Sequence, residues 1–400
     1  MSSAQIVHLL YAARCLRGFG DGFAVIILPA YLSALGFNPI QIGLVAAASL
    51  FGTAVFTLLI GLIAPRHDLR GMLLLGAALM AFTGITFPSS EHLILIAAVS
   101  FIGTINPSTG DIGVLVPLEH ALLARSIADE ERTRAFARYS LIGALSMAAG
   151  ALAAGMTDIL VARGLGNIAA FRLMFYLYAV LGLMAAAVYQ RLPRTPAEPS
   201  RPVAPLGPSR HVVYKLAALF SVDAFAGGFI VQSLLALWLF EKFELSLTAA
   251  SLFFFWSGVL SAFSYPVAAR IAGRIGLINT MVFTHIPSSI CLIAAAFSSD
   301  LTLALGLLLV RSALSQMDVP TRTSYVMAVV TPPERTAAAS VTAVPRSLAS
   351  SISPAFAGML LTLPFAGLPL VFCGSLKIVY DLALLYSFRH IKPPEEKARF

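Results

Sequence analysis

Long runs of apolar residues alternate with short polar breaks along the whole chain. An α-helix of about 20 residues crosses the roughly 30 Å hydrocarbon core of a bilayer, and most of these runs reach that length. A spanning helix also satisfies its own backbone hydrogen bonds, as lipid requires. The pattern therefore predicts an all-α integral membrane protein with twelve transmembrane helices, near residues 9–35, 40–64, 71–88, 93–123, 136–161, 171–190, 212–240, 247–269, 278–297, 301–329, 337–362 and 366–388.

One polar break is longer than the others and separates the first six runs from the last six. It covers residues 191–211 and contains six prolines and four arginines. Proline-rich segments are extended linkers and do not continue a helix. The sequence therefore predicts an N-terminal six-helix bundle over 1–190, a cytoplasmic linker over 191–211, and a C-terminal six-helix bundle with a short cytoplasmic tail over 212–400.

The two halves repeat one another. A shift of 203 residues aligns 116–156 with 319–359 without gaps and gives 10 identities in 41 positions, including Glu131-Arg132-Thr133 on Glu334-Arg335-Thr336. Asp21 aligns with Asp223 at a shift of 202. Because each half contains six expected spans, both repeats have the same topology. They are then related by a pseudo-two-fold axis along the membrane normal, a design found in transporters with parallel repeats.

Composition supports the membrane assignment and gives an orientation. The chain is 58% hydrophobic and 12% charged, against about 25% charged in ordinary globular proteins. Seventeen Lys and Arg residues lie in the breaks of one side and three lie on the other (Arg163, Arg172 and Lys242). The positive-inside rule then places both termini and the linker in the cytoplasm. The net charge of +8 is thus a topology signal and indicates no nucleic-acid partner.

The loop after the second expected span carries a recognisable motif. It reads Gly61-Leu-Ile-Ala-Pro-Arg66-His-Asp-Leu-Arg70, and similar Glu-Arg-Thr segments precede the fifth and eleventh spans. In these features, and over essentially its whole length, the chain resembles the major facilitator superfamily, in particular bacterial efflux permeases. The loop departs from the family motif at Pro65, where the family has an aspartate. The resemblance implies a transporter with Arg66 and Arg70 at a cytoplasmic gate. The compact loops and short tails favour the plasma (inner) membrane of a bacterium, and we expect a monomer without a cofactor or metal.

Thirteen charged residues lie inside the expected spans. Unpaired, each would cost about 3 kcal/mol in the bilayer, so they must pair or face water. They are Arg14, Arg17, Asp21, Asp111, Glu119, Lys215, Asp223, Arg311, Asp318, Arg322, Arg346, Lys377 and Asp381. Ten of them fall on the first, fourth, seventh and tenth spans, which line the central cavity in the family that the chain resembles. We therefore expect Arg17, Asp111, Arg311 and Asp318 to line a substrate cavity.

Two symmetric pairs suggest further roles. Asp21 and Asp223 are equivalent in the repeat and lie near the middle of the bilayer, where a carboxylate can exchange a proton as access alternates. One of the two is our candidate for proton coupling. Glu119 and Arg322 are equivalent toward the cytoplasmic ends of their spans and carry opposite charges, so we expect them to form a cytoplasmic gate.

The leading functional hypothesis is secondary active transport of a small organic solute by alternating access, with proton-coupled efflux. The alternative is uptake or facilitated diffusion of a small organic anion that uses the arginines inside the membrane. A membrane-embedded enzyme would need a nucleophile or metal constellation, and the sequence shows no such arrangement of His, Cys or Ser. The three cysteines are far apart and predict neither disulfides nor a zinc site.

Overall fold

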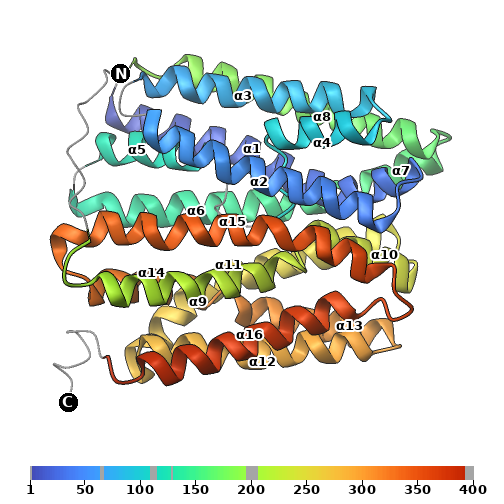
Figure 1. Ribbon diagram of the computed structural model, residues 1–400. Helices are drawn as coiled ribbons and strands as arrows, with labels where there is room; N and C mark the ends of the chain where they lie inside the picture. The colour runs from blue at the N-terminus through green and yellow to red at the C-terminus, as the bar shows by residue number, and fades with distance from the viewer. Residues whose placement is uncertain (1, 64–66, 109–114, 128, 195–205, 392–400) are drawn as a thin grey trace. The chain divides into compact units, whose positions relative to one another are not determined.

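The computed structural model describes residues 2–63, 67–108, 115–127, 129–194 and 206–391. In this part of the chain the secondary structure is helical (Figure 1). Ten helical stretches are long and apolar enough to cross a membrane: Ser3–Ala34, Pro39–Ile63, Leu69–Ser89, Arg134–Ala162, Asn167–Gln190, Arg210–Phe243, Leu247–Ile275, Leu277–Phe297, Leu301–Val329 and Leu368–Phe388. The expectation of an all-α integral membrane protein is confirmed.

Two expected spans are not among these ten. The run at 93–123 is described as α4 (Leu93–Ile102) and α5 (Val116–Ser126), with residues 109–114 outside the described part. The run at 337–362 corresponds to α15 (Arg335–Leu361), which has sufficient length but lower apolarity. The number of twelve spans therefore stays a prediction, supported by the length of these elements.

The contacts divide the chain into two compact units. Unit 1 comprises 1–200 and 231–258, and unit 2 comprises 201–230 and 259–400. Unit 1 contains α1 (Ser3–Ala34), α2 (Pro39–Ile63), α3 (Leu69–Thr86), α4, α5, α6 (Asp129–Ala153), α7 (Met156–Ala162), α8 (Asn167–Gln190), α10 (Gln232–Phe243) and the first part of α11 (Leu247–Ile275). Unit 2 contains α9 (Arg210–Gly228), the rest of α11, α12 (Leu277–Phe297), α13 (Leu301–Ser315), α14 (Asp318–Val329), α15 and α16 (Leu368–Phe388). The bundle limits expected from the sequence stay predictions.

A proline explains the interruption between α13 and α14. Residues 301–329 form one apolar stretch, yet the α-helix stops at Ser315 and resumes at Asp318. Pro320 has no N–H with which to bond the carbonyl of Gln316, which accepts a hydrogen bond from the Val319 N–H at 3.3 Å instead, a tighter turn of three residues. The break allows α14 to begin with Asp318 and to carry Arg322 one turn later.

Glycines bring α1 and α6 into close contact in unit 1. A Cβ on Gly22 of α1 would collide with the backbone carbonyl of Met147, and one on Gly150 of α6 would collide with that of Phe19. Small residues at such positions allow the backbones of spanning helices to approach closely. This tight contact fixes the position of Asp21, which directly precedes Gly22.

Glu334 joins the loop before α15 to the start of α9 in unit 2. Its carboxylate accepts hydrogen bonds from the Ser209 hydroxyl (2.7 Å), the Ser209 backbone N–H (3.3 Å), the Gly207 N–H and the Thr331 hydroxyl. Ser209 is the N-cap of α9, where the helix dipole favours a negative charge. These donors stabilise the ionised form and hold the pKa of Glu334 at about 2.

We expect this contact to make stability fall with acidification. Because the pKa of Glu334 is lowered in the folded state, its contribution is complete above the unfolded value of about 4.3 and is lost as the pH falls toward 2. Unfolding midpoints of the purified protein near pH 7, pH 4.5 and pH 3 test this. Glu334→Gln should lower the midpoint at neutral pH and flatten the acid slope, whereas Glu91→Gln, at an exposed side chain, should do neither. The prediction is contradicted if the unfolding midpoints of the wild type, Glu334→Gln and Glu91→Gln fall equally steeply as the pH is lowered.

Candidate functional site

Glu119 connects four helices of unit 1. Its fully buried carboxylate on α5 accepts hydrogen bonds from Arg17 on α1, from Tyr139 on α6 and from Tyr189 on α8, the last at 2.6 Å. The guanidinium of Arg14, one turn before Arg17, lies 5.1 Å from the centre of the Tyr139 ring. A buried ion pair offsets its desolvation cost only when the remaining polar atoms are also bonded. The two tyrosine hydroxyls supply those bonds to Glu119, whereas the buried Nε of Arg17 has no hydrogen-bond partner among the described residues.

Asp21 occupies a different environment on the same helix. Its half-buried carboxylate accepts a hydrogen bond from the Tyr178 hydroxyl at 3.0 Å, and that hydroxyl lies 3.0 Å from the Thr104 hydroxyl. Among the residues that the structure describes, Asp21 forms no ion pair. The nearest arginine along α1 is Arg17, which is bound to Glu119. Asp21 is thus a carboxylate within a spanning helix that is held by one neutral hydroxyl group, that of Tyr178.

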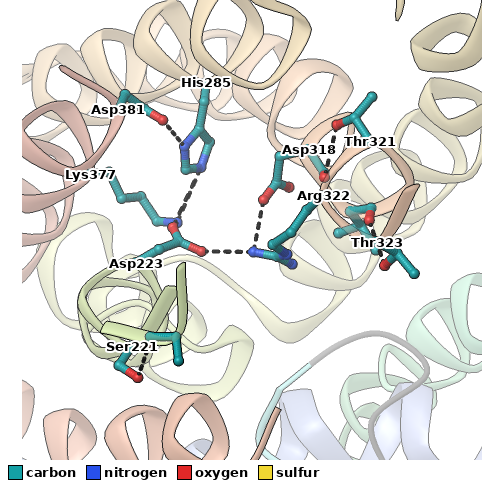
Figure 2. A network of polar contacts seen from close by, with 11 residues as sticks. Ser221, Asp223, His285, Asp318, Thr321, Arg322, Thr323, Lys377 and Asp381 are labelled. Atoms are coloured by element: carbon teal, nitrogen blue, oxygen red, sulfur yellow. Dashed lines mark hydrogen bonds and ion pairs between the residues drawn. The ribbon is translucent and has the colours of Figure 1, made fainter. Parts of the chain in front are cut away.

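Asp223, the repeat equivalent of Asp21, lies at the centre of a charged cluster in unit 2 (Figure 2). Its Oδ1 accepts from Lys377 Nζ on α16 at 2.6 Å, and its Oδ2 accepts from Arg322 on α14 at 3.1 Å. Arg322 also pairs with Asp318 at 3.0 Å, one turn earlier on α14. The acidic side chains of Asp223 and Asp318 are each less than one-tenth exposed, so these pairs are shielded from solvent.

A histidine extends this cluster toward α12. His285 Nδ1 lies 3.0 Å from Asp381 Oδ1, and its Nε2 lies 3.2 Å from Lys377 Nζ and 3.9 Å from Asp223 Oδ1. Figure 2 shows the ring between the two acidic side chains, with Lys377 beside it. Asp381 is fully buried and its Oδ2 has no hydrogen-bond partner in the described part of the chain.

Two further arginines of unit 2 carry charges that are not paired in the same way. Arg311 on α13 makes no ion pair with any described residue, and the ionisable side chain that acts on it electrostatically is the buried thiol of Cys373. Arg346 on α15 lies within electrostatic range of Arg322, Asp223 and Asp318, and its buried Nε has no hydrogen-bond partner among the described residues.

In each unit an ion pair joins the first helix of the repeat to α5 or its repeat equivalent, but the helices that carry the acid and the cation are exchanged. In unit 1 the cation, Arg17, is on the first helix and the acid, Glu119, is on α5. In unit 2 the acid, Asp223, is on α9 and the cation, Arg322, is on the repeat equivalent of α5. Glu119 and Arg322 therefore each pair within their own unit in this structure. Their role as a cytoplasmic gate stays a prediction.

The other predicted site residues are distributed as follows. Asp111 and Arg66 lie outside the residues that the structure describes. Arg70 is in the first turn of α3, where its backbone N–H bonds the side chain of the N-cap residue Asp68. Arg17 and Asp318 are held by ion pairs, and Arg311 is the cavity candidate that is not. The predicted roles of these residues in binding, coupling and gating stay predictions.

Sequence reasoning did not anticipate several members of these networks. Tyr139, Tyr178 and Tyr189 were not distinguished from other aromatic residues of the spans. A signal did exist, because Tyr178 aligns with Tyr380 at the shift of 202 that aligns the two aspartates. His285 is one of seven scattered histidines in the sequence. The i, i+4 spacing of Lys377 and Asp381 predicts that they pair with each other, whereas in the structure Lys377 bonds Asp223 and Asp381 bonds His285.

Comparison with known proteins gives a consistent picture. A model of the Major Facilitator Superfamily matches residues 10–222. An uncharacterized membrane protein of Saccharomyces cerevisiae is 25% identical over 424 residues, covering 96% of this chain and 94% of the relative. The xylose transporter XylE from E. coli, in an inward-open conformation, has a TM-score of 0.75 at 13% identity and covers 94% of this chain and 95% of its own. A human organic anion transporter has a TM-score of 0.67 at 15% identity, covering 96% and 100%. The structural matches show a shared fold.

Proposed function

The chain belongs to the major facilitator superfamily, and on that premise we propose that this membrane transporter moves a small organic solute by alternating access, exporting it from the cytoplasm in exchange for protons. The transporter assignment follows from the family. The distribution of Lys and Arg among the loops supports cytoplasmic termini. A bacterial plasma membrane and a monomeric state are parts of the same proposal.

The surroundings of Asp21 are the observation that supports proton coupling. A carboxylate inside a spanning helix is costly unless it is compensated, and such groups serve as proton carriers in transporters. Asp21 is held by Tyr178 and, within the described structure, by no cation, so it can gain a proton without leaving a buried positive charge unpaired. Asp223 cannot, because Lys377 and Arg322 both depend on its charge. Of the two equivalent aspartates, we therefore assign the coupling role to Asp21.

Arg311 favours a second candidate, the uptake or facilitated diffusion of a small organic anion. An arginine in a spanning helix needs a counter-charge, and the described residues supply none for Arg311. A carboxylate or phosphate group on the solute is the chemistry that a guanidinium binds best. The fold does not choose between the two candidates, because its matches include a xylose transporter and an organic anion transporter.

Ligand screening followed by flux measurements separates the candidates. Thermal stabilisation of the purified protein across sugars, nucleosides, organic anions and amphipathic cations identifies a solute, because a ligand of the folded state raises apparent stability. In proteoliposomes we expect a pH gradient to drive that solute and Asp21→Asn to abolish the drive while exchange without a gradient persists. Anionic hits that Arg311→Gln abolishes, without any effect of a pH gradient, would support the second candidate instead.

Matched controls come from an exposed ion pair of unit 1. Glu91 and Arg172 form a surface pair at 2.9 Å, with exposed fractions of 67% and 37%. Such pairs contribute at most about 1 kcal/mol. Glu91→Gln and Arg172→Gln should therefore retain both ligand stabilisation and gradient-driven flux. If Asp21→Asn behaves like Glu91→Gln in the flux assay, the coupling role of Asp21 is wrong.

A further inference from the structure

The charged side chains inside unit 2 carry more positive than negative charge. Within the described structure, four cations and three carboxylates of its helices form one network of ion pairs and electrostatic neighbours. They are Arg311, Arg322, Arg346 and Lys377 against Asp223, Asp318 and Asp381. Proton uptake by His285 or by a carboxylate would add positive charge, and arginine keeps its proton in proteins. With Lys377 bonded to Asp223 as an ammonium, the network therefore has an excess of at least one positive charge.

Arg346 on α15 is a member of this network that no acid neutralises directly. The acids that act on it are Asp223 and Asp318, and Arg322 is paired with both of them (Figure 2). The like charge of Arg322 acts on Arg346 more strongly than either acid does. The buried Nε of Arg346 has no hydrogen-bond partner among the described residues. A guanidinium in such a place within a spanning helix calls for an anion from outside the chain.

The helix that carries Arg346 has one polar half. Thr342 and Ser350 lie one turn before and one turn after Arg346 on the same face of α15, and Ser353 lies two turns after it. Large apolar residues occupy the opposite half, where three of them are exposed as side chains that face lipid are: Ile352, Phe356 and Met359. The half of α15 with Arg346 therefore faces away from lipid.

Close packing of α15 on α9 places this polar half beside the charged network. A Cβ on Gly228 of α9 would collide with the Ser353 hydroxyl and the Ser350 carbonyl, so the two backbones approach closely there. The same helix α9 carries Asp223. Arg346 is only half-buried, whereas Asp223 is buried. Arg346 thus lies at an accessible edge of the network, where a solute can reach it.

We propose that Arg346 binds the carboxylate of the transported solute, and that this solute is an organic monoanion. The proposal rests on the transport function proposed above and names the class of its solute, whichever the direction of transport. A guanidinium offers two parallel N–H donors to the two oxygens of a carboxylate. One negative charge balances an excess of one positive charge, whereas a dianion would reverse its sign. The hydroxyl groups on the polar half of α15 can bond other polar groups of the solute.

The stability of Arg346→Gln distinguishes a binding residue from a structural one. Because Arg346 makes no ion pair with a described acid, its removal strands no carboxylate, and the unfolding midpoint of the purified protein should equal or exceed that of the wild type. Arg322→Gln is the comparison, since it leaves Asp318 without its partner and should lower the midpoint. A loss in Arg346→Gln as large as that in Arg322→Gln would mean that Arg346 neutralises a buried acid, and the proposal would be wrong.

Modification of arginines by phenylglyoxal tests the site without knowledge of the natural solute. The wild-type protein in lipid nanodiscs is treated with the reagent, and the modified residues are identified by mass spectrometry. Acetate and benzoate should slow the reaction of Arg346 about threefold or more, because a bound anion blocks it by mass action. The neutral amides acetamide and benzamide should not slow it. Arg335, an exposed residue at the start of the same helix, is the internal control and should react equally under all conditions.

Variants separate binding at Arg346 from a general effect of charge. Thermal stabilisation by the same two carboxylates should be lost in Arg346→Gln, reduced in Arg346→Lys, which keeps the charge but not the paired donors, and unchanged in Arg335→Gln. An Arg346 that does not react with phenylglyoxal, or that acetamide or chloride protects as well as acetate does, overturns the proposal. Stabilisation that is lost in Arg311→Gln and retained in Arg346→Gln places the anion at Arg311 and also overturns it.

Flux measurements separate this proposal from the proposed function. If a pH gradient drives only neutral or cationic solutes, equally in the wild type and in Arg346→Gln, proton-coupled export stands and the anion site is wrong. If carboxylates bind at Arg346 and cross the membrane without any effect of a pH gradient, the anion site stands and proton-coupled export is wrong.

Discussion

Replacing Glu119 by leucine should destabilise the folded protein by about 3–5 kcal/mol, the range measured when one partner of a buried ion pair is removed. The substitution leaves the buried guanidinium of Arg17 without its carboxylate and removes the acceptor of the Tyr139 and Tyr189 hydroxyls. The four helices that meet at Glu119 lose their common contact. Reversible unfolding of the purified protein in mixed micelles, titrated with SDS, measures the change in free energy.

The double variant Arg17→Met with Glu119→Leu is the control for this prediction. It replaces both charges by apolar side chains of similar size, so no buried charge remains unpaired, and substitutions of this kind are often neutral. We expect the double variant to recover a large part of the lost stability. Equal destabilisation in the single and double variants would show that the loss comes from packing around α5 and not from the stranded guanidinium.

The sequence predicted the helices better than the contacts between them. A run of apolar residues must be helical in lipid whatever surrounds it, so the ten apolar stretches were visible from composition and length alone. Partner choice depends on which faces of distant segments meet. Arg17 and Glu119 are 102 residues apart, and Asp223 and Lys377 are 154 apart. Arg17 and Asp21 are four residues apart and therefore share one helical face, but that spacing does not show that one binds a carboxylate and the other a tyrosine.

Repeat symmetry indicates the position of a residue but not its chemistry. The alignment makes Asp21 and Asp223 equivalent, and one of the two is expected to carry the coupling proton. The structure gives them different partners because the side chains around them differ. Tyr178 donates to Asp21, whereas the ring of its equivalent Tyr380 lies nearly perpendicular to that of His285, and Lys377 supplies the bond to Asp223. A duplicated fold thus retains the position of a carboxylate while its neighbours determine whether it can accept a proton.

The same contrast predicts unequal effects of one substitution at the two equivalent aspartates. Asp223→Asn should cost about 3 kcal/mol or more, because it removes the charge that compensates both Lys377 and Arg322 in a buried site. Asp21→Asn should cost less than about 1 kcal/mol, since asparagine still accepts from Tyr178 and, in the described structure, no cation is stranded. The SDS titration used for Glu119 measures both variants. Similar losses in the two would mean that Asp21 also neutralises a buried cation, and its assignment as the proton carrier would then be wrong.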